Sequence, residues 1–129
     1  MLAETTTLIR PAPTVVLLDD DAALRMALTF SLEIEGYRVE ACATGEELMA
    51  LDLPRSGACL ILDYRLGGMS GLDVLQALRQ RGVQLPAVLI TSNPTPGVRA
   101  RAARLQAQVV EKPLLGDHLL GHIHRMLPS

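Results

Sequence analysis

Short apolar runs alternate with segments of helical spacing along most of this chain. The first run, residues 14–18, is β-branched and has no apolar–polar alternation, which is typical of a strand buried on both faces. The next segment carries Leu24, Leu28 and Leu32 at helical spacing and reaches Gly36, a residue type that often ends helices. The chain therefore opens with a predicted strand followed by a predicted helix.

The same alternation continues to the end of the chain. Further strands are predicted over residues 37–42, 58–62, 86–90 and 107–111. Further helices are predicted over residues 44–51, 72–81, 97–106 and 115–127. Parallel strands need a crossover helix between them, and such crossovers are right-handed. The pattern predicts a doubly wound α/β fold, with a parallel sheet between two layers of helices and its crevice at the carboxyl ends of the strands.

Size and composition limit the possible classes of protein. The chain has 129 residues, of which 49% are hydrophobic and 20% charged, with a net charge of −2. This is the size of one domain with a real core, and the charge gives no reason to expect nucleic-acid binding. No apolar stretch approaches the roughly 18 residues that span a bilayer, and residues 1–13 do not resemble a signal peptide. We expect a loose arm over 1–13, one domain over 14–129, no membrane contact and a cytoplasmic location.

Polar residues gather where the predicted strands end. They are Asp19, Asp20 and Asp21 after the first strand, Asp63 after the third, Thr91 and Ser92 after the fourth, and Glu111, Lys112 and Pro113 at the fifth. Taken singly, each has an ordinary structural explanation as a helix cap, a turn residue or a solvated side chain. Because the carboxyl ends of parallel strands share one edge, we expect these side chains to converge.

Converging carboxylates raise one another's pKa unless a cation neutralises them. Mg²⁺ is the cation that fits best, since one or two carboxylates, waters and a phosphate oxygen commonly hold it. A hydroxyl from Thr91 and an ammonium from Lys112 would add partners for a phosphoryl group. A carboxylate can itself accept that group as an acyl phosphate, so Asp63 is the predicted nucleophile.

These motifs, in this order, resemble the receiver domain of two-component response regulators over residues 14–127. The matching segments are Leu18-Asp19-Asp20-Asp21, Leu60-Ile61-Leu62-Asp63, Gly68-Met69-Ser70-Gly71-Leu72-Asp73, Leu89-Ile90-Thr91-Ser92 and Glu111-Lys112-Pro113. The resemblance implies a flavodoxin-like (βα)5 fold with strand order 2-1-3-4-5. Arg65 and the turn before Leu72 are most similar to receivers of regulators with a C-terminal helix-turn-helix domain, so we expect a stand-alone receiver or a piece of such a regulator.

The resemblance also implies roles for individual residues. Asp63 would accept a phosphoryl group from a sensor histidine kinase or a phosphotransfer protein. The Mg²⁺ ligands would be Asp19, Asp20, Asp63 and the backbone carbonyl of Arg65, while Thr91 and Lys112 would contact the phosphoryl oxygens. The Lys112–Pro113 bond is usually cis in such domains. The chain would catalyse only its own phosphorylation and dephosphorylation, and is not otherwise expected to be an enzyme.

Some positions differ from the pattern of the family. Gly67 stands where receivers usually carry proline, which favours a more mobile loop. Val109 stands where receivers commonly place Phe or Tyr. In those domains the aromatic ring turns inward when the threonine hydroxyl moves to the phosphoryl group, and a valine has no ring that could do so. A small residue with glycine is usual before the fifth strand, but residues 105–108 read Leu-Gln-Ala-Gln, and Asn93-Pro94-Thr95-Pro96 makes the preceding loop stiff. We therefore predict an ordinary acceptor site with an atypical switch surface.

Three other functions are weaker hypotheses. A phosphohydrolase of the haloacid dehalogenase type needs a second Asp two residues after the nucleophile, where this chain has Arg65. A nucleotide-binding domain is disfavoured because the chain has neither the G-x-G-x-x-G nor the G-x-x-x-x-G-K-[ST] motif. A receiver that acts as an unphosphorylated interaction module is favoured by Gly67 and Val109, and disfavoured by the complete acidic, hydroxyl and lysine set.

The remaining features have mainly structural interpretations. Cys42 and Cys59 are predicted to be buried without chemistry, since no ligand spacing surrounds them. His118 and His122 could bind zinc in principle but favour a surface position. Arg99, Arg101 and Arg104 favour a solvated face over a docking patch. Tyr64 either shields the acyl phosphate or simply packs. A downstream effector or a second copy could dock on the last two helices and the strand between them.

Overall fold

The structure is a computed structural model that describes residues 12–114 and 117–127. Five strands form one parallel sheet in the order β2-β1-β3-β4-β5, which confirms the predicted doubly wound topology. The strands are β1 Thr14–Leu18, β2 Arg38–Cys42, β3 Ala58–Asp63, β4 Ala87–Thr91 and β5 Ala107–Glu111. The helices are α2 Ala22–Ile34, α3 Gly45–Met49, α4 Gly71–Gln80, α5 Pro96–Arg104 and α6 His118–Met126.

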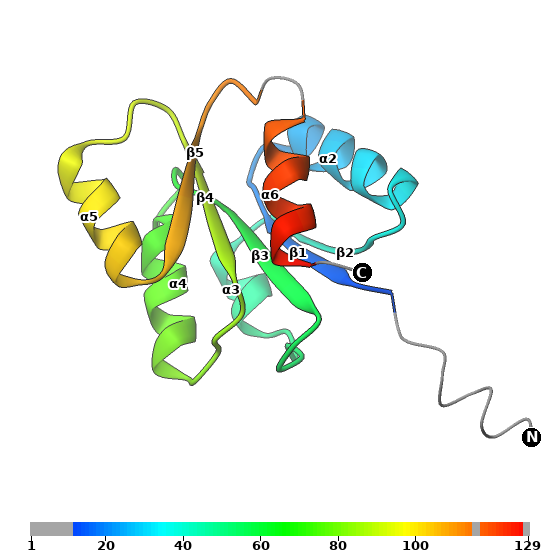
Figure 1. The fold of residues 1–129 in the computed structure, drawn as a ribbon. Helices are drawn as coiled ribbons and strands as arrows, with labels where there is room; N and C mark the ends of the chain where they lie inside the picture. The colour runs from blue at the N-terminus through cyan, green and yellow to red at the C-terminus, as the bar shows by residue number, and fades with distance from the viewer. Residues whose placement is uncertain (1–11, 115–116, 128–129) are drawn as a thin grey trace, which may run out of the picture.

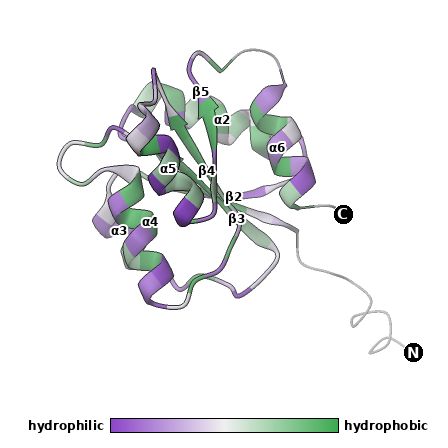
Figure 2. Ribbon diagram, turned by 60° about the vertical axis from the view of Figure 1, so that its left-hand side comes forward, coloured by the Kyte–Doolittle hydropathy of each residue, from purple (hydrophilic) through white to green (hydrophobic). Residues whose placement is uncertain are grey.

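Two hydrophobic clusters sandwich the sheet. One face packs against α3, α4 and α5 through residues such as Leu48, Leu75 and Ala102, and the other packs against α2 and α6 through Leu32 and Ile123. Figure 1 shows these two helical layers on opposite sides of the strands. In Figure 2 the central strands are mostly hydrophobic while the helices are mixed, as expected when only one side of each helix is covered.

Local side-chain chemistry sets where most helices begin. Asp21 accepts hydrogen bonds from the backbone N–H groups of Ala23 and Leu24 at the start of α2. Thr44 and Ser70 form capping boxes with the residues three positions later, which begin α3 and α4. The carboxyl ends of β1 and β3 are therefore each followed closely by a fixed helix start.

Several predicted boundaries were wrong by small amounts. The second helix is shorter than predicted, because Ala50 already caps α3 and Leu51 turns back toward the core. The last helix begins at His118, and Asp117 before it makes no side-chain capping bond. The first two residues predicted for that helix lie outside the described residues, as do residues 1–11 of the predicted arm. Among the described helices, none is long and apolar enough to cross a membrane.

Candidate functional site

The carboxyl ends of β1 and β3 bring three carboxylates together. Asp19 is 2% exposed and Asp63 is 4% exposed, whereas Asp20 reaches solvent. One oxygen from each lies within 4.8 Å of the others. In the part of the chain that the structure describes, this is the one group of three or more acidic, histidine or cysteine side chains with the spacing of a metal site. The predicted convergence of the three carboxylates is confirmed.

Lys112 and Thr91 border the same site. The ammonium Nζ of Lys112 lies 3.1 Å from Oδ1 of Asp63, and the Lys112 backbone N–H donates to the carbonyl of Thr91 at 2.9 Å. Thr91 is 3% exposed, and its hydroxyl donates to the Ser92 carbonyl at 3.3 Å. The Lys112–Pro113 bond is cis, in agreement with the resemblance. A cation and a hydroxyl thus stand at the strand ends beside the acidic group.

The carboxylate oxygens accept only some of the hydrogen bonds that they could accept. The backbone N–H of Asp21 donates to Asp19 Oδ1 at 2.8 Å. By contrast, Asp63 Oδ1 is buried and has no aligned hydrogen bond, since Lys112 is close to it without the geometry of a donor. A buried polar atom in this state is typical of a binding or reactive group. Burial, followed by the nearby Asp63 carboxylate, raises the pKa of Asp19, although the Asp21 hydrogen bond partly offsets this.

Neighbouring residues hold the Asp19 peptide and the β3 turn in place. Arg25 on α2 donates to the Asp19 carbonyl at 2.7 Å, a contact that no sequence motif indicated. The backbone N–H of Tyr64 donates to Ile90 at 2.9 Å, and the N–H of Gly71 donates to Tyr64 at 2.9 Å. The turn after β3 is therefore tied both to β4 and to the start of α4.

Tyr64 and Arg65 both line a cavity beside Thr91, but they differ in burial. Tyr64 is partly buried and packs against the hydrophobic cluster on the α4 side, which favours the packed interpretation over a shield. Arg65 is exposed, and it lines a cavity of about 190 Å³ beside Thr91 and Asn93. The backbone carbonyl of Arg65 as a metal ligand stays a prediction.

The surface of α5 and β5, which is predicted to respond to changes at the site, includes Val109 and two paired arginines. Val109 is partly buried and packs against the cluster on the α5 side. Arg99 pairs with Glu111, and Arg101 donates to Asp73 at 2.9 Å and to Gln76 at 2.8 Å. Arg99 and Arg104 are exposed and Arg101 is partly exposed, which agrees with the predicted solvated face, and two of the three also pair with carboxylates on neighbouring elements.

The two cysteines are buried, as predicted, and His118 and His122 differ in exposure. His118 is exposed, and His122 is partly buried beside Gln108 with no metal-like cluster around it among the described side chains. Cys42 and Cys59 are free and buried, and burial raises the pKa of their thiols to about 11 and about 12. Neither thiol is available as a thiolate near neutral pH.

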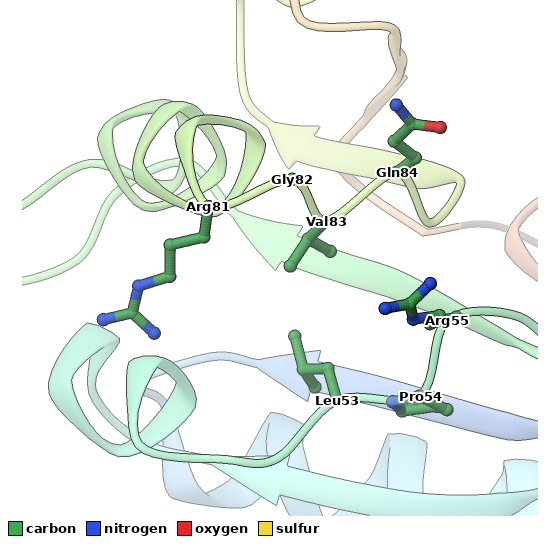
Figure 3. Close-up of a pocket in the computed structure, with 7 residues that line it drawn as sticks. All are labelled: Leu53, Pro54, Arg55, Arg81, Gly82, Val83 and Gln84. Carbon is green, nitrogen blue, oxygen red and sulfur yellow. The ribbon is translucent and has the colours of Figure 1, made fainter.

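A wider groove lies at the opposite edge of the sheet. It has a volume of about 540 Å³ and lies between the loops that precede β3 and β4. Figure 3 shows Leu53 and Val83 facing each other there, with Arg55 and Arg81 on either side and Gln84 pointing away. Arg81 donates to the Met49 carbonyl at the end of α3, at 2.7 Å. The groove holds none of the strand-end residues predicted from the sequence.

Comparisons with known proteins agree with this geometry. The family described as "Response regulator receiver domain" matches residues 15–124. Response regulator protein TodT of Pseudomonas putida is 35% identical over 90% of this chain and 52% of its own length. Phosphate regulon transcriptional regulatory protein PhoB of Rhizobium meliloti is 31% identical over 89% of the chain and 52% of its own length. The chain thus spans about half the length of these curated relatives.

Solved structures give the same fold. The response regulator StyR superposes with a TM-score of 0.83 at 30% identity, covering 91% of this chain and 60% of its own. The receiver domain of HemR from Leptospira biflexa, in its non-phosphorylated form, superposes with a TM-score of 0.82 at 28% identity, covering 91% of this chain and 95% of its own. The likeness extends over the sheet and both helical layers.

Proposed function

Because the chain belongs to the response regulator receiver family, we propose that Asp63 accepts a phosphoryl group from a phosphohistidine of a partner protein, in a Mg²⁺-dependent reaction. One observation carries this proposal. Asp63 is a buried carboxylate whose Oδ1 lacks an aligned hydrogen bond, although an ammonium and two further carboxylates lie around it. A carboxylate held in this way is available for nucleophilic attack.

The proposed step forms one bond and breaks one. A carboxylate oxygen of Asp63 attacks phosphorus, and the phosphorus–nitrogen bond to the donor imidazole breaks. The imidazole leaves with the bonding electron pair. If its other ring nitrogen carries no proton, the leaving nitrogen takes one from water. Lys112 faces the developing charge on the phosphoryl oxygens, and the Thr91 hydroxyl supplies a hydrogen bond to them.

The acidic group fits a divalent cation. Its three carboxylates supply hard oxygen ligands, and the raised pKa of Asp19 reflects burial and repulsion that a cation would relieve. When bound, Mg²⁺ supplies charge neutralisation at the phosphoryl oxygens. Asp19, Asp20, Asp63 and the carbonyl of Arg65 are the residues proposed to hold it.

The outcome of phosphorylation would be a change of partner binding rather than turnover of a separate substrate. An acyl phosphate carries about −1.5 to −2 charges where the carboxylate carried −1, and it places them on three exposed phosphoryl oxygens, so Thr91 and Lys112 would be drawn toward it. α5 and β5 lie between Thr91 and Lys112 in the chain, and α6 follows Lys112. We assign the downstream effector or a second copy to this surface, within a receiver domain spanning 14–129.

A row of apolar side chains on α2 supports contact with the donor protein. Met26, Phe30 and Ile34 repeat every four residues and are 73%, 67% and 66% exposed. The helix that carries them starts directly after Asp19 and Asp20. Three side chains cover much less than the roughly 800 Å² per partner of a stable complex, which suits a transient donor. Phe30→Asp should slow transfer from the phosphorylated donor and leave labelling by acetyl phosphate unchanged.

Labelling with acetyl phosphate tests the function itself. With Mg²⁺ present, mass spectrometry should place one phosphoryl group on the peptide that contains Asp63, and chelation should prevent it. Asp63→Asn should carry no label, whereas Asp52→Asn, an exposed carboxylate at the opposite edge, should label normally. Robust labelling of Asp63→Asn would place the acceptor elsewhere. An unlabelled wild-type chain would favour the interaction module that works without phosphorylation.

A further inference from the structure

Gly71 is packed more tightly against the acceptor residue than any side chain would allow. It is the first residue of α4 and is buried. A Cβ built on Gly71 would lie 2.3 Å from the carbonyl oxygen of Asp63, 3.0 Å from its carbonyl carbon and 3.2 Å from Cδ1 of Leu89. Contacts below 3.0 Å are essentially never made by a real Cβ, so one of these groups would have to move.

The other glycines near the site are different. Gly67 has open space where a Cβ would stand and no unusual backbone conformation. Gly68 also has open space but has a φ of 126°, which favours glycine for conformational reasons. At Gly45 a Cβ would meet side-chain atoms, 2.9 Å from Val74 and 3.4 Å from Met69. Among these four, only Gly71 would press on the backbone of the acceptor.

The groups around Gly71 have little freedom to yield. Leu89 is fully buried in the core, and the peptide after Asp63 is held in the sheet by the Tyr64 N–H bond to Ile90. On its other side, the start of α4 is held by the capping box between Ser70 and Asp73. Cores and sheet ladders resist such insertions, so the methyl group would displace either α4 or the Asp63 peptide.

We infer that Gly71 is a positioning residue of the acceptor site, because the absence of a side chain lets α4 rest against the Asp63 peptide and hold its carboxylate in place. This inference rests on the proposed function of Asp63. The carboxylate has to keep its 3.1 Å separation from Lys112 and its place beside Asp19 and Asp20. In-line transfer is sensitive to such placement, and a shift of about 1 Å can cost about 100-fold in rate.

The test compares three alanine variants of the whole chain. Gly71→Ala adds a methyl group against the Asp63 backbone, Gly45→Ala adds one against side chains, and Gly67→Ala adds one to open space. The thermal unfolding of each variant is measured first. The Mg²⁺ affinity and the maximal rate of labelling by acetyl phosphate are then measured at a temperature where every variant is folded. Amide NMR shifts of Asp63, Tyr64 and Ile90 report the position of the acceptor peptide.

Gly71→Ala should lower the maximal labelling rate by about 10- to 100-fold and shift the three amides. Gly45→Ala should lose stability but label at the wild-type rate, and Gly67→Ala should resemble wild type in both. If Gly71→Ala folds poorly, the measurements are made with trimethylamine N-oxide, which favours the compact state. A folded Gly71→Ala chain that labels within twofold of wild type would overturn the inference, whether or not the amides shift.

The same experiment separates this inference from the proposed function. A wild-type chain that takes no label contradicts the phosphoacceptor role of Asp63. In that case the amide shifts and the Mg²⁺ affinity of Gly71→Ala still show whether Gly71 positions the Asp63 peptide. If wild type labels and Gly71→Ala labels equally well, the phosphoacceptor role stands and the positioning role fails.

Discussion

The two edges of the sheet use charge in different ways. At the carboxyl edge, Asp19 and Asp63 are buried, and one oxygen of Asp63 has no aligned hydrogen bond. At the amino edge, Arg79 and Arg81 donate to backbone carbonyls at the ends of helices and loops, beside a groove of about 540 Å³. The larger opening is therefore at the edge where Arg79 and Arg81 already donate to backbone carbonyls.

In this protein, the buried carboxylates identify the proposed reactive site better than the size of a cavity does. Charges at the amino edge complete the hydrogen bonding of the fold, so their removal should change stability. The carboxylates at the carboxyl edge repel one another and would hold the cation, so their removal should change the chemistry. Each variant below tests whether this division holds.

The largest effect is expected at Asp19. Asp19→Asn should slow labelling by acetyl phosphate more than about tenfold at limiting Mg²⁺, because even the loss of an outer partner of a metal ligand costs 10- to 100-fold in affinity. Asp52→Asn, a carboxylate exposed at the amino edge, is the matched control and should label normally. Equal rates for the two variants would remove Asp19 from the metal site.

Arg79→Ala should have the largest effect on stability. The Arg79 guanidinium donates to the carbonyls of Leu105, Val83, Leu85 and Gln106, and so joins α4 to the loops before β4 and β5. Losing these charged hydrogen bonds should lower the free energy of unfolding by about 2–3 kcal/mol in urea titrations. Labelling per folded molecule should stay unchanged.

Arg81→Ala is the control for that measurement, since Arg81 bonds a single carbonyl and should cost about 1 kcal/mol. If Arg79→Ala instead abolished labelling while the chain remained folded, the amino edge would take part in the chemistry and the division between the edges would fail.

The smallest effect concerns Asp73, which stabilises the start of α4. The hydrogen bond from the Ser70 backbone and the one from Arg101 lower the pKa of Asp73 below its ordinary value of 3.8. A lowered carboxyl pKa means that its stabilisation is present above 3.8 and is lost as the pH falls through the folded-state pKa. Asp73→Ala should therefore cost about 0.5–1 kcal/mol at neutral pH and almost nothing at strongly acidic pH.

Urea titrations of Asp73→Ala and wild type across this pH range measure the difference. Asp52→Ala, whose exposed carboxylate has no recorded hydrogen bond or ion pair among the described residues, should show no such trend. A cost at Asp73 that grew as the pH fell would contradict the sign of this prediction.

Most of the fold and the members of the site could be predicted from the sequence. Residues 14–18 have the strand boundaries predicted for them, because strands buried in a parallel sheet are short and continuously apolar. The boundaries of β5 at 107–111 also match the prediction, although this edge strand is mostly uncovered. Parallel topology then places every strand end at one edge, which is enough to bring Asp19, Asp63, Thr91 and Lys112 together. The types of these residues and their positions directly after the strands were sufficient to predict that they converge.

Contacts between elements distant in the sequence could not be predicted. Nothing in the chain indicates that Arg25 supports the Asp19 carbonyl or that Arg101 reaches Asp73, because long flexible side chains can choose among several partners. The role of Gly71 was also missed, since a glycine before a helix usually suggests backbone freedom rather than close packing. These features depend on distances that only the folded chain defines.

Amide NMR with Mg²⁺ and beryllofluoride, an acyl-phosphate analogue, tests the central claim most directly. We predict large shifts around Asp63, Thr91 and Lys112 that require Mg²⁺ and are absent from Asp63→Asn, with no change at Arg55 and Arg81 in the groove at the amino edge. An unchanged spectrum near Asp63 and Thr91, or shifts centred on that groove, would contradict the assignment of the carboxyl edge as a phosphoacceptor site.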